Sequence, residues 1–316
     1  MVRTVLLFGS GGFLGRHIRR VLDPHYVVRC PDRQECDLVT LDLPALAALL
    51  GRERPDAVVL AAGRIVGSGY DFVQAHVTVT AKMIEAMAAA APAARLVRIG
   101  SAAEYGPVAR DVAVREGDPA SPVGAYGVSH LAATRLAELA GASGRVDTVV
   151  LRVFNPVGPG MPPGNVLGRA AGLIRAAVER GDDHVALGLL DSWRDFVDVR
   201  DVAGAVLAAV RCGALPQRVF NVGSGRATAT REAVRQLADI AGFPGEIRTG
   251  AFGADATRSA AVPWICADIG RGQRLLGWTP AHPLADSLTA LWRETVERVP
   301  GLVRQPSGRT TDVRHT

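Results

Sequence analysis

The chain has 316 residues, of which 48% are hydrophobic and 21% are charged, and its formal net charge is +5. This length suffices for two lobes around a large core, and the composition is that of a globular protein, which excludes a disordered or fibrous chain. The basic residues are dispersed, and the apolar runs fall short of the roughly 20 residues that cross a bilayer. We therefore expect neither a nucleic-acid partner nor a membrane.

The N-terminus begins with a short apolar run that ends at glycines, without the longer apolar core and cleavage site of a secretory signal. The four cysteines are scattered, form no CxxC pair and have no histidine at metal-ligand spacing. Such cysteine use fits a reducing compartment. We expect a cytoplasmic protein that holds no metal.

Short β-branched runs alternate with amphipathic or alanine-rich segments through the first half of the chain. Strands are predicted at 4–8, 27–30, 57–61, 96–100 and 148–153. Helices are predicted at 13–22, 43–51, 72–91 and 124–141. Because the strands are continuously apolar, we expect a doubly wound α/β domain over 1–154, with a parallel sheet covered on both faces.

The second half opens with seven prolines and glycines among the ten residues 155–164, which cannot form a regular element and indicate a lobe boundary or a lid. Helices at 166–180, 200–212, 228–241 and 284–297 and a strand at 218–222 follow. We expect 155–300 to form a smaller mixed α/β lobe that returns to the sheet at least once. The polar segment 301–316 is expected to be a disordered tail.

Gly9, Gly12 and Gly15 lie directly after the first strand and directly before the first helix. Glycines permit a tight turn and close backbone approach, while the helix N-terminus offers unpaired N–H groups and a partial positive charge. This context predicts a site for the pyrophosphate of a dinucleotide.

The spacing GxxGxxG, with Phe13 and Leu14 before the last glycine, resembles that of the extended short-chain dehydrogenase/reductases, or NAD-dependent epimerase/dehydratase family. The resemblance spans nearly the whole chain. It implies a Rossmann sheet with a separate substrate lobe, and further cofactor contacts at two places. These are adenine contacts at Asp37 and Leu38, and a strand end that passes under the cofactor at Ala61, Ala62 and Gly63.

The choice between NAD and NADP depends on the end of the second strand, where an acid would hold the ribose 2′-OH and an arginine would accept the 2′-phosphate. Both are present, because Arg29 and Arg33 flank Asp32. We favour NADP(H) slightly over NAD(H). Surface arginines with no such role are the alternative.

Ser101 closes the fourth predicted strand and Tyr126 lies on a predicted helix, which resembles the Ser/Tyr pair of the family. The resemblance implies that Tyr126 exchanges a proton with a carbonyl or hydroxyl while a hydride moves to or from nicotinamide, and that Ser101 bonds the same oxygen. A tyrosine with an ordinary pKa near ~10 needs a helper that favours its ionised form. In the family this helper is a lysine four residues later, and here the position is His130.

The motif is therefore YxxxH instead of YxxxK, and three interpretations follow. His130 contacts the nicotinamide ribose as a neutral hydrogen-bonding partner and catalysis persists, or it is charged in place, or the protein is a weak or non-catalytic binder. We favour the first. His76 replaces an asparagine of the family's pattern, but a buried helix residue explains it, and we assign no catalytic role to it or to His17.

The substrate side also resembles the family, which implies that Asn155 and Arg194 contact a nucleotide-sugar diphosphate. Arg258, ten residues before Asp268, matches reductases of the GDP-4-keto-6-deoxymannose type. The Asp–Glu pair of sugar 4,6-dehydratases is absent, because Ala102 and Ala103 occupy those positions.

The resemblance thus predicts an enzyme that reduces a 4-keto nucleotide-diphosphate sugar with NAD(P)H, acting as a homodimer through the helices near 72–91 and 124–141. A 4-epimerase with retained NAD would use the same residues. A cofactor- or sugar-binding protein with impaired catalysis is the alternative from another class.

Overall fold

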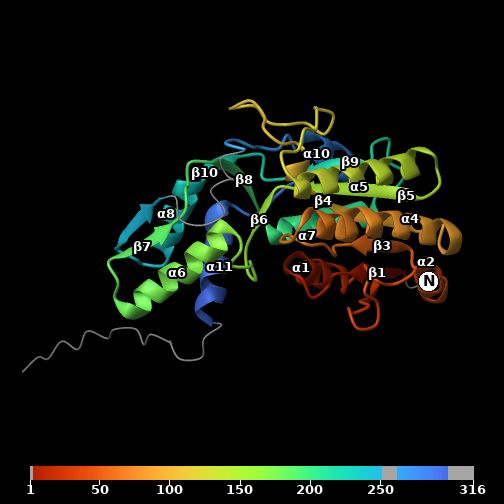
Figure 1. Ribbon diagram of the computed structural model, residues 1–316, viewed down its shortest axis with the longest axis horizontal. Helices are drawn as coiled ribbons and strands as arrows, with labels where there is room; N and C mark the ends of the chain where they lie inside the picture. The colour runs from red at the N-terminus through yellow and green to blue at the C-terminus, as the bar shows by residue number, and fades with distance from the viewer. Residues whose placement is uncertain (1–2, 251–261, 298–316) are drawn as a thin grey trace, which may run out of the picture.

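The computed structural model describes residues 3–250 and 262–297 (Figure 1). Its main sheet has six parallel strands in the order β2-β1-β3-β4-β5-β9. Their bounds are β1 (Thr4–Phe8), β2 (Val27–Arg29), β3 (Ala57–Leu60), β4 (Arg95–Ser101), β5 (Asp147–Val153) and β9 (Val219–Val222). The strand order reverses between β1 and β3, and ligands of such sheets bind beyond the carboxyl ends of the strands at this point. The predicted doubly wound α/β fold is confirmed.

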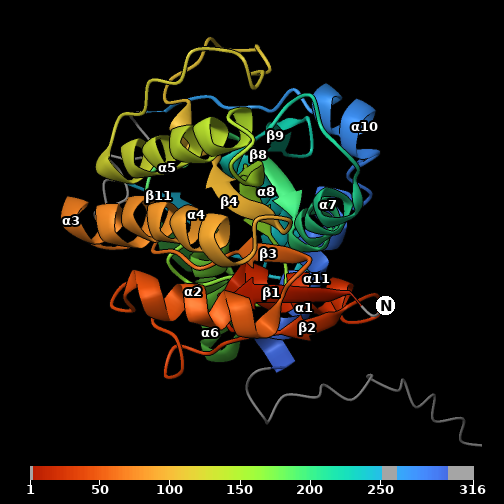
Figure 2. The same cartoon turned by 90° about the vertical axis from the view of Figure 1, so that its right-hand side faces the viewer.

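Helices cover both faces of this sheet, because successive strand residues point to opposite sides and both sides are apolar (Figure 2). On one face, α1 (Phe13–Leu22) packs beside α7 (Val199–Arg211) over a core that includes Leu7 and Val59. On the other, the core that includes Leu6 and Val58 lies beneath several helices. These are α2 (Leu43–Glu53), α4 (Val79–Ala90), which the helical segments α3 (Gly69–Phe72) and η1 (Val73–Thr78) precede, and α5 (Ala125–Ala142).

The smaller lobe contains a three-stranded sheet in the order β10-β8-β6 and a two-stranded sheet of β11 and β7. These strands are β6 (Asn155–Val157), β7 (His184–Leu187), β8 (Trp193–Asp198), β10 (Ala227–Ala229) and β11 (Glu246–Thr249). The helices α6 (Val166–Arg180), α8 (Thr230–Ile240) and α11 (Leu284–Glu297) enclose its core, and α10 (Gly270–Leu276) contacts β9. Residues beyond 155 also return to the main sheet through β9 and α7. The predicted tail, 301–316, lies outside the described residues.

The helix predicted over 72–91 is interrupted in the structure. It begins at Gly69, after a capping box in which the Ser68 hydroxyl accepts a hydrogen bond from the Asp71 N–H, and then contains a π-helical segment, Val73–Thr78. Such insertions rotate the residues that follow and are frequent at functional sites. Along the described chain, no helix is long and apolar enough to cross a membrane.

Candidate functional site

The glycine loop between β1 and α1 requires glycine at two positions. Gly9 has a φ of +85°, and a Cβ there would lie 2.6 Å from the Ala62 nitrogen. A Cβ on Gly15 would lie 1.9 Å from the Gly9 oxygen, while the Gly12 N–H donates to that same oxygen at 3.0 Å. The loop therefore packs against the strand end Ala61–Ala62 and begins α1 with exposed N–H groups. This cradle fits the pyrophosphate of a dinucleotide.

The first turns of α1 join the two lobes. Leu14 packs against the core beneath the main sheet, whereas Phe13 packs against the core of the smaller lobe. One turn later, the His17 Nε2 lies 2.9 Å from the Pro159 oxygen, and burial lowers the pKa of this imidazole. The proline-rich segment after β6 is thus held beside the glycine loop.

The segment after β2 carries the residues expected at the adenosine end of the cofactor. Arg29 ends β2 with an exposed side chain, 3.9 Å from a carboxylate oxygen of Glu53. Arg33 is also exposed and donates from Nε to the Asp37 carboxylate at 3.2 Å, whereas Leu38 is buried in the core. Both guanidinium groups face solvent, where they can contact an anionic ligand, although Glu53 and Asp37 neutralise part of their charge.

Ser101 and Tyr126 come from adjoining segments. Ser101 ends β4, and its Oγ accepts a hydrogen bond from the Ala103 N–H at 3.2 Å. The first turn of α5 packs directly on this turn, because a Cβ on Gly127 would lie 2.4 Å from the Ala103 oxygen. Tyr126 is the second residue of α5, and its ring makes an edge contact with Phe72 at 5.5 Å. Close packing of α5 on the end of β4 thus brings the predicted pair to one edge of the sheet.

His130 is buried one helical turn beyond Tyr126, with ring centroids 4.6 Å apart. Its Nδ1 lies 3.3 Å from Nη2 of Arg98, and its ring centroid lies 4.1 Å from that of His76. Burial, and then the positive charge of Arg98, hold the pKa of His130 well below its usual value. Because a guanidinium can only donate, Nδ1 accepts and the His130 proton must be on Nε2. The structure therefore favours a neutral His130 over a charged one.

His76 lies in the π-helical segment and links three elements. Its Nε2 accepts from the Arg64 N–H at 3.2 Å, and its Nδ1 lies 2.9 Å from the Ser129 hydroxyl, which donates to the Tyr126 carbonyl. Burial, and then the charge of Arg98, lower the pKa of His76 to about 4. His76 is thus buried, as expected, and it also anchors the turn that carries Tyr126. The sequence feature that pointed to this position was the histidine in place of the family's asparagine.

A buried charge network that the sequence analysis missed lies beneath α5. Arg98 donates to the hydroxyls of Thr80 and Thr134 at 3.1 and 3.2 Å. The Glu104 carboxylate accepts from Thr134 at 2.9 Å and from Arg152 at 2.7 Å. Arg98, Glu104 and Arg152 are at most 2% exposed. An arginine inside the apolar strand LVRIGS was the available signal, since arginine is rarely buried.

In the smaller lobe, the structure brings two of the predicted substrate residues to adjacent strands. Asn155 begins β6 and donates from Nδ2 to the Asp195 oxygen of β8 at 3.0 Å, next to Arg194. The Arg194 guanidinium donates to the Trp193 oxygen, forms no ion pair with any described carboxylate, and burial lowers its pKa to about 10. A half-buried cation of this kind suits an anionic ligand. Arg258 lies outside the described residues.

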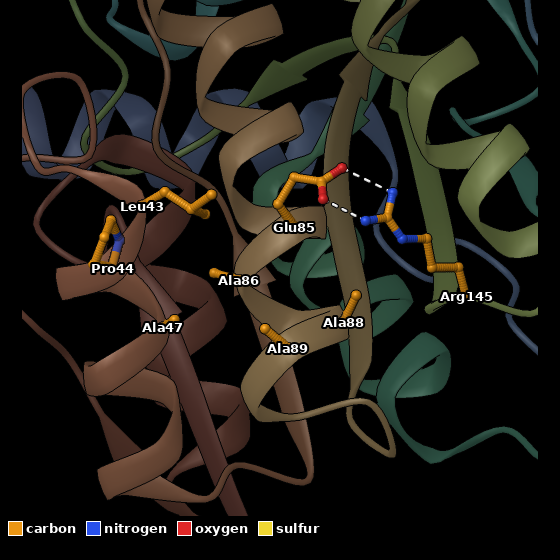
Figure 3. Close-up of a pocket in the computed structure, with 8 residues that line it drawn as sticks. All are labelled: Leu43, Pro44, Ala47, Glu85, Ala86, Ala88, Ala89 and Arg145. Atoms are coloured by element: carbon orange, nitrogen blue, oxygen red, sulfur yellow. Dashed lines mark hydrogen bonds and ion pairs between the residues drawn. The ribbon is translucent and has the colours of Figure 1, made fainter.

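The surface hollow of about 540 Å³ between α2 and α4 is a separate feature (Figure 3). Leu43, Pro44 and Ala47 of α2 and three alanines of α4 line it, together with an ion pair between Glu85 and Arg145. None of the predicted site residues lines it. Within the described ranges, no cluster of three or more histidine, cysteine or acidic side chains could hold a metal. The candidate site is therefore the sheet edge formed by the glycine loop, the end of β4 and the start of α5.

The chain is similar in sequence and fold to several known proteins. The NAD dependent epimerase/dehydratase family matches residues 5–223. The chain is 41% identical over 258 residues to dTDP-6-deoxy-L-talose 4-dehydrogenase (NAD(P)(+)) of Kitasatospora kifunensis, covering 81% of this chain and 80% of that protein. It is 30% identical over 311 residues to GDP-6-deoxy-D-mannose reductase of Pseudomonas aeruginosa, covering 95% and 99%. The structure of RMD from Pseudomonas aeruginosa complexed with NADPH matches with a TM-score of 0.83 and 28% identity, over 94% and 100% of the two chains.

Proposed function

The chain belongs to the NAD-dependent epimerase/dehydratase family, and we propose that it is an NAD(P)-dependent oxidoreductase that reduces the 4-keto group of a nucleotide-diphosphate sugar. The observation that carries this function is the packing of the Tyr126 turn on the end of β4, at the sheet edge that also holds the glycine cradle. Relatives named as a nucleotide-sugar 4-dehydrogenase and a nucleotide-sugar reductase support it.

The side chains at the sheet edge have separate roles in ketone reduction. A nicotinamide cofactor, when bound at the glycine cradle, would supply the hydride. Tyr126 gives its phenolic proton to the oxygen at C4, so that no alkoxide accumulates. The Ser101 Oγ accepts from the Ala103 N–H, and the same hydroxyl can donate its own proton to the oxygen at C4. His130, with its proton on Nε2, offers a donor to a ribose hydroxyl, while Asn155 and Arg194 hold the diphosphate.

Elimination of water is poorly supported, because Ala102 and Ala103 offer neither acid nor base. Tyr105 cannot replace them: it is buried, its hydroxyl donates to Asn221 at 2.6 Å, and burial raises its pKa to about 12. The 4-epimerase that the sequence left open would use the same residues, but the relatives at 41% and 30% identity bear the names of a dehydrogenase and a reductase.

The test is to incubate the purified protein with NADPH and a panel of GDP-, dTDP- and UDP-linked 4-keto-6-deoxy sugars, following reduced cofactor by absorbance and products by chromatography. We expect one NADPH to be consumed for each 6-deoxy sugar formed. Sugar conversion without net cofactor change would indicate an epimerase. Cofactor binding without turnover of any sugar would indicate a non-catalytic binder.

For the cofactor, we propose that NADP(H) is preferred over NAD(H) because Arg29 and Arg33 face solvent beyond β2. Each exposed contact to the 2′-phosphate should contribute about 0.5–1 kcal/mol. The double variant Arg29→Gln/Arg33→Gln should therefore raise the KM for NADPH roughly tenfold and leave that for NADH nearly unchanged. Arg52→Gln, an exposed arginine on α2, is the matched control. Equal effects on both cofactors would contradict the assignment.

We also propose a homodimer through the outer faces of the run from α3 to α4 and of α5. Large apolar side chains are exposed there, with Tyr70 73% and Leu139 69% accessible, and Val128 lies on the same face of α5 as Leu139. Such a surface is typical of a contact between subunits. Light scattering at micromolar concentration tests the proposal, and the mass of a monomer would exclude it.

A further inference from the structure

The electrostatic problem at this site is that Tyr126 needs a nearby positive charge and His130 does not supply one. A phenol with an ordinary pKa near ~10 exchanges protons poorly at neutral pH unless its ionised form is stabilised. Burial and Arg98 keep His130 uncharged. His76, on its other side, is held neutral by the same two causes. Within the described part of the chain, a positive charge for Tyr126 is therefore to be sought on a group other than these two imidazoles.

Arg98 in the middle of β4 is the available cation. It is 2% exposed, and its hydrogen bonds go to Thr80, Thr134 and His130, which are all neutral acceptors. Among the residues that the structure describes, it forms no ion pair with a carboxylate. Burial lowers the pKa of Arg98, and the nearby Glu104 carboxylate acts in the opposite direction, but that carboxylate is already bonded to Arg152. The two buried guanidiniums thus share one carboxylate, which leaves one excess positive charge.

The excess charge lies one imidazole ring away from Tyr126. The Arg98 Nη2 is 3.3 Å from His130 Nδ1, and the His130 ring is 4.6 Å from the Tyr126 ring between centroids. Burial lowers the pKa of Arg98, and the negative charge of a Tyr126 phenolate across the His130 ring acts in the opposite direction and raises it. By reciprocity, the guanidinium stabilises that phenolate. Among the described residues that contact Arg98 or His130, the side chains of Thr80, Thr134 and His76 are neutral, and the nearby charges of Glu104 of η2 (Ala102–Glu104) and Arg152 of β5 form a pair.

We propose that Arg98 is a positioning residue of this site, which stabilises negative charge on Tyr126 from within the sheet and fixes His130 with its proton on Nε2. This inference rests on the proposed reductase function for its catalytic consequence. A guanidinium remains charged throughout the working pH range, whereas a histidine in its place would titrate. In a buried site the same charge also acts more strongly than it would in water.

The test is a mutant cycle of Arg98→Met, His130→Lys and the double variant, assayed in the direction of alcohol oxidation, where Tyr126 acts as the base. A cation favours the ionised phenol, so removing Arg98 should move the pH midpoint of kcat upward by about one unit and lower kcat about tenfold at neutral pH. The His130→Lys change in the wild type places two like charges together and should lower activity. In the Arg98→Met background, the same change should restore it.

Two controls separate charge from structure. Arg95→Met removes another buried arginine of β4, which binds Asp147 at the opposite end of the strand, and should leave the pH midpoint unchanged. Arg98→Lys should preserve most of the wild-type midpoint, because it retains the charge. If Arg98→Met does not fold, Arg98→Gln tests the same point with a neutral side chain that can still bond the threonines.

A second readout does not depend on turnover. The chain has four tyrosines, so an ultraviolet difference titration of the protein without substrate follows few phenols. We expect the titration step that Tyr126→Phe abolishes to move to higher pH in Arg98→Met. An unchanged step and an unchanged kcat midpoint in a folded Arg98→Met protein would overturn the proposal. If no sugar is turned over but the step moves, the proposed function fails and the role of Arg98 stands.

Discussion

Tyr126→Phe is expected to lower kcat for ketone reduction by about 10²–10⁴-fold, which is the usual contribution of a positioned general acid. The change removes only the hydroxyl. The ring keeps its contacts with Phe72, His76 and His130, which hold it in place at centroid distances of 5.5, 5.5 and 4.6 Å. Cofactor affinity should therefore change little. The measurement is steady-state NADPH oxidation, with NADPH binding followed separately by fluorescence.

Tyr105→Phe is the matched control for this prediction, because it removes the hydroxyl of a neighbouring tyrosine that is buried and bonded to Asn221. It should cost stability but leave the pH dependence of kcat unchanged. A Tyr126→Phe protein with kcat close to that of the wild type would mean that another group, or solvent, protonates the C4 oxygen. In that event the assigned chemistry would be wrong, although the protein could still bind the sugar.

The main sheet was predictable because its strands are short, continuously apolar and separated by periodic helices. The observed β1, α1 and α6 have the same bounds as the predicted segments 4–8, 13–22 and 166–180. The short strands of the smaller lobe, such as β6 and β10, were not predicted, since three residues carry no detectable alternation. The π-helical segment Val73–Thr78 was missed as well, because its apolar spacing resembles that of an ordinary helix.

The candidate site was predictable where its residues follow one another along the chain. The glycine loop follows from local spacing, whereas the Ser101, Tyr126 and His130 positions follow from the resemblance to the family, and the structure brings these segments together. The place of Arg98 in an apolar strand indicated a buried arginine, but its partners were not predictable, because they come from positions 80, 130 and 134 on two different helices. Whether a buried arginine has acceptors depends on tertiary packing, which no local pattern in the sequence reports.

The largest effect on stability is expected from Glu104→Gln, which should lower the free energy of unfolding by about 3–5 kcal/mol. Glu104 is fully buried and bonds Arg152, Thr134 and the Ser101 N–H. Glutamine has nearly the same shape but no charge, so two buried guanidiniums would lose their shared carboxylate. Urea denaturation followed by circular dichroism measures the loss. The control Glu85→Gln removes an exposed ion pair with Arg145 and should cost about 0.5 kcal/mol or less.

A double variant decides whether this loss arises from charge or from packing. If the cause is the uncompensated charge, Arg152→Met in the Glu104→Gln background removes one of the two stranded guanidiniums, and the two changes together should cost less than the sum of the single changes. If the stability losses of the two single variants simply add, or if Glu104→Gln alone lowers the free energy of unfolding by less than about 1 kcal/mol, the Glu104 carboxylate does not neutralise the charge of the buried arginines. Glu104 also accepts a hydrogen bond from the Ser101 N–H and so holds the backbone at the end of β4. A folded Glu104→Gln protein should therefore also have a lower kcat than the wild type. Such a result would connect the buried charges beneath α5 to the reaction at the edge of the sheet.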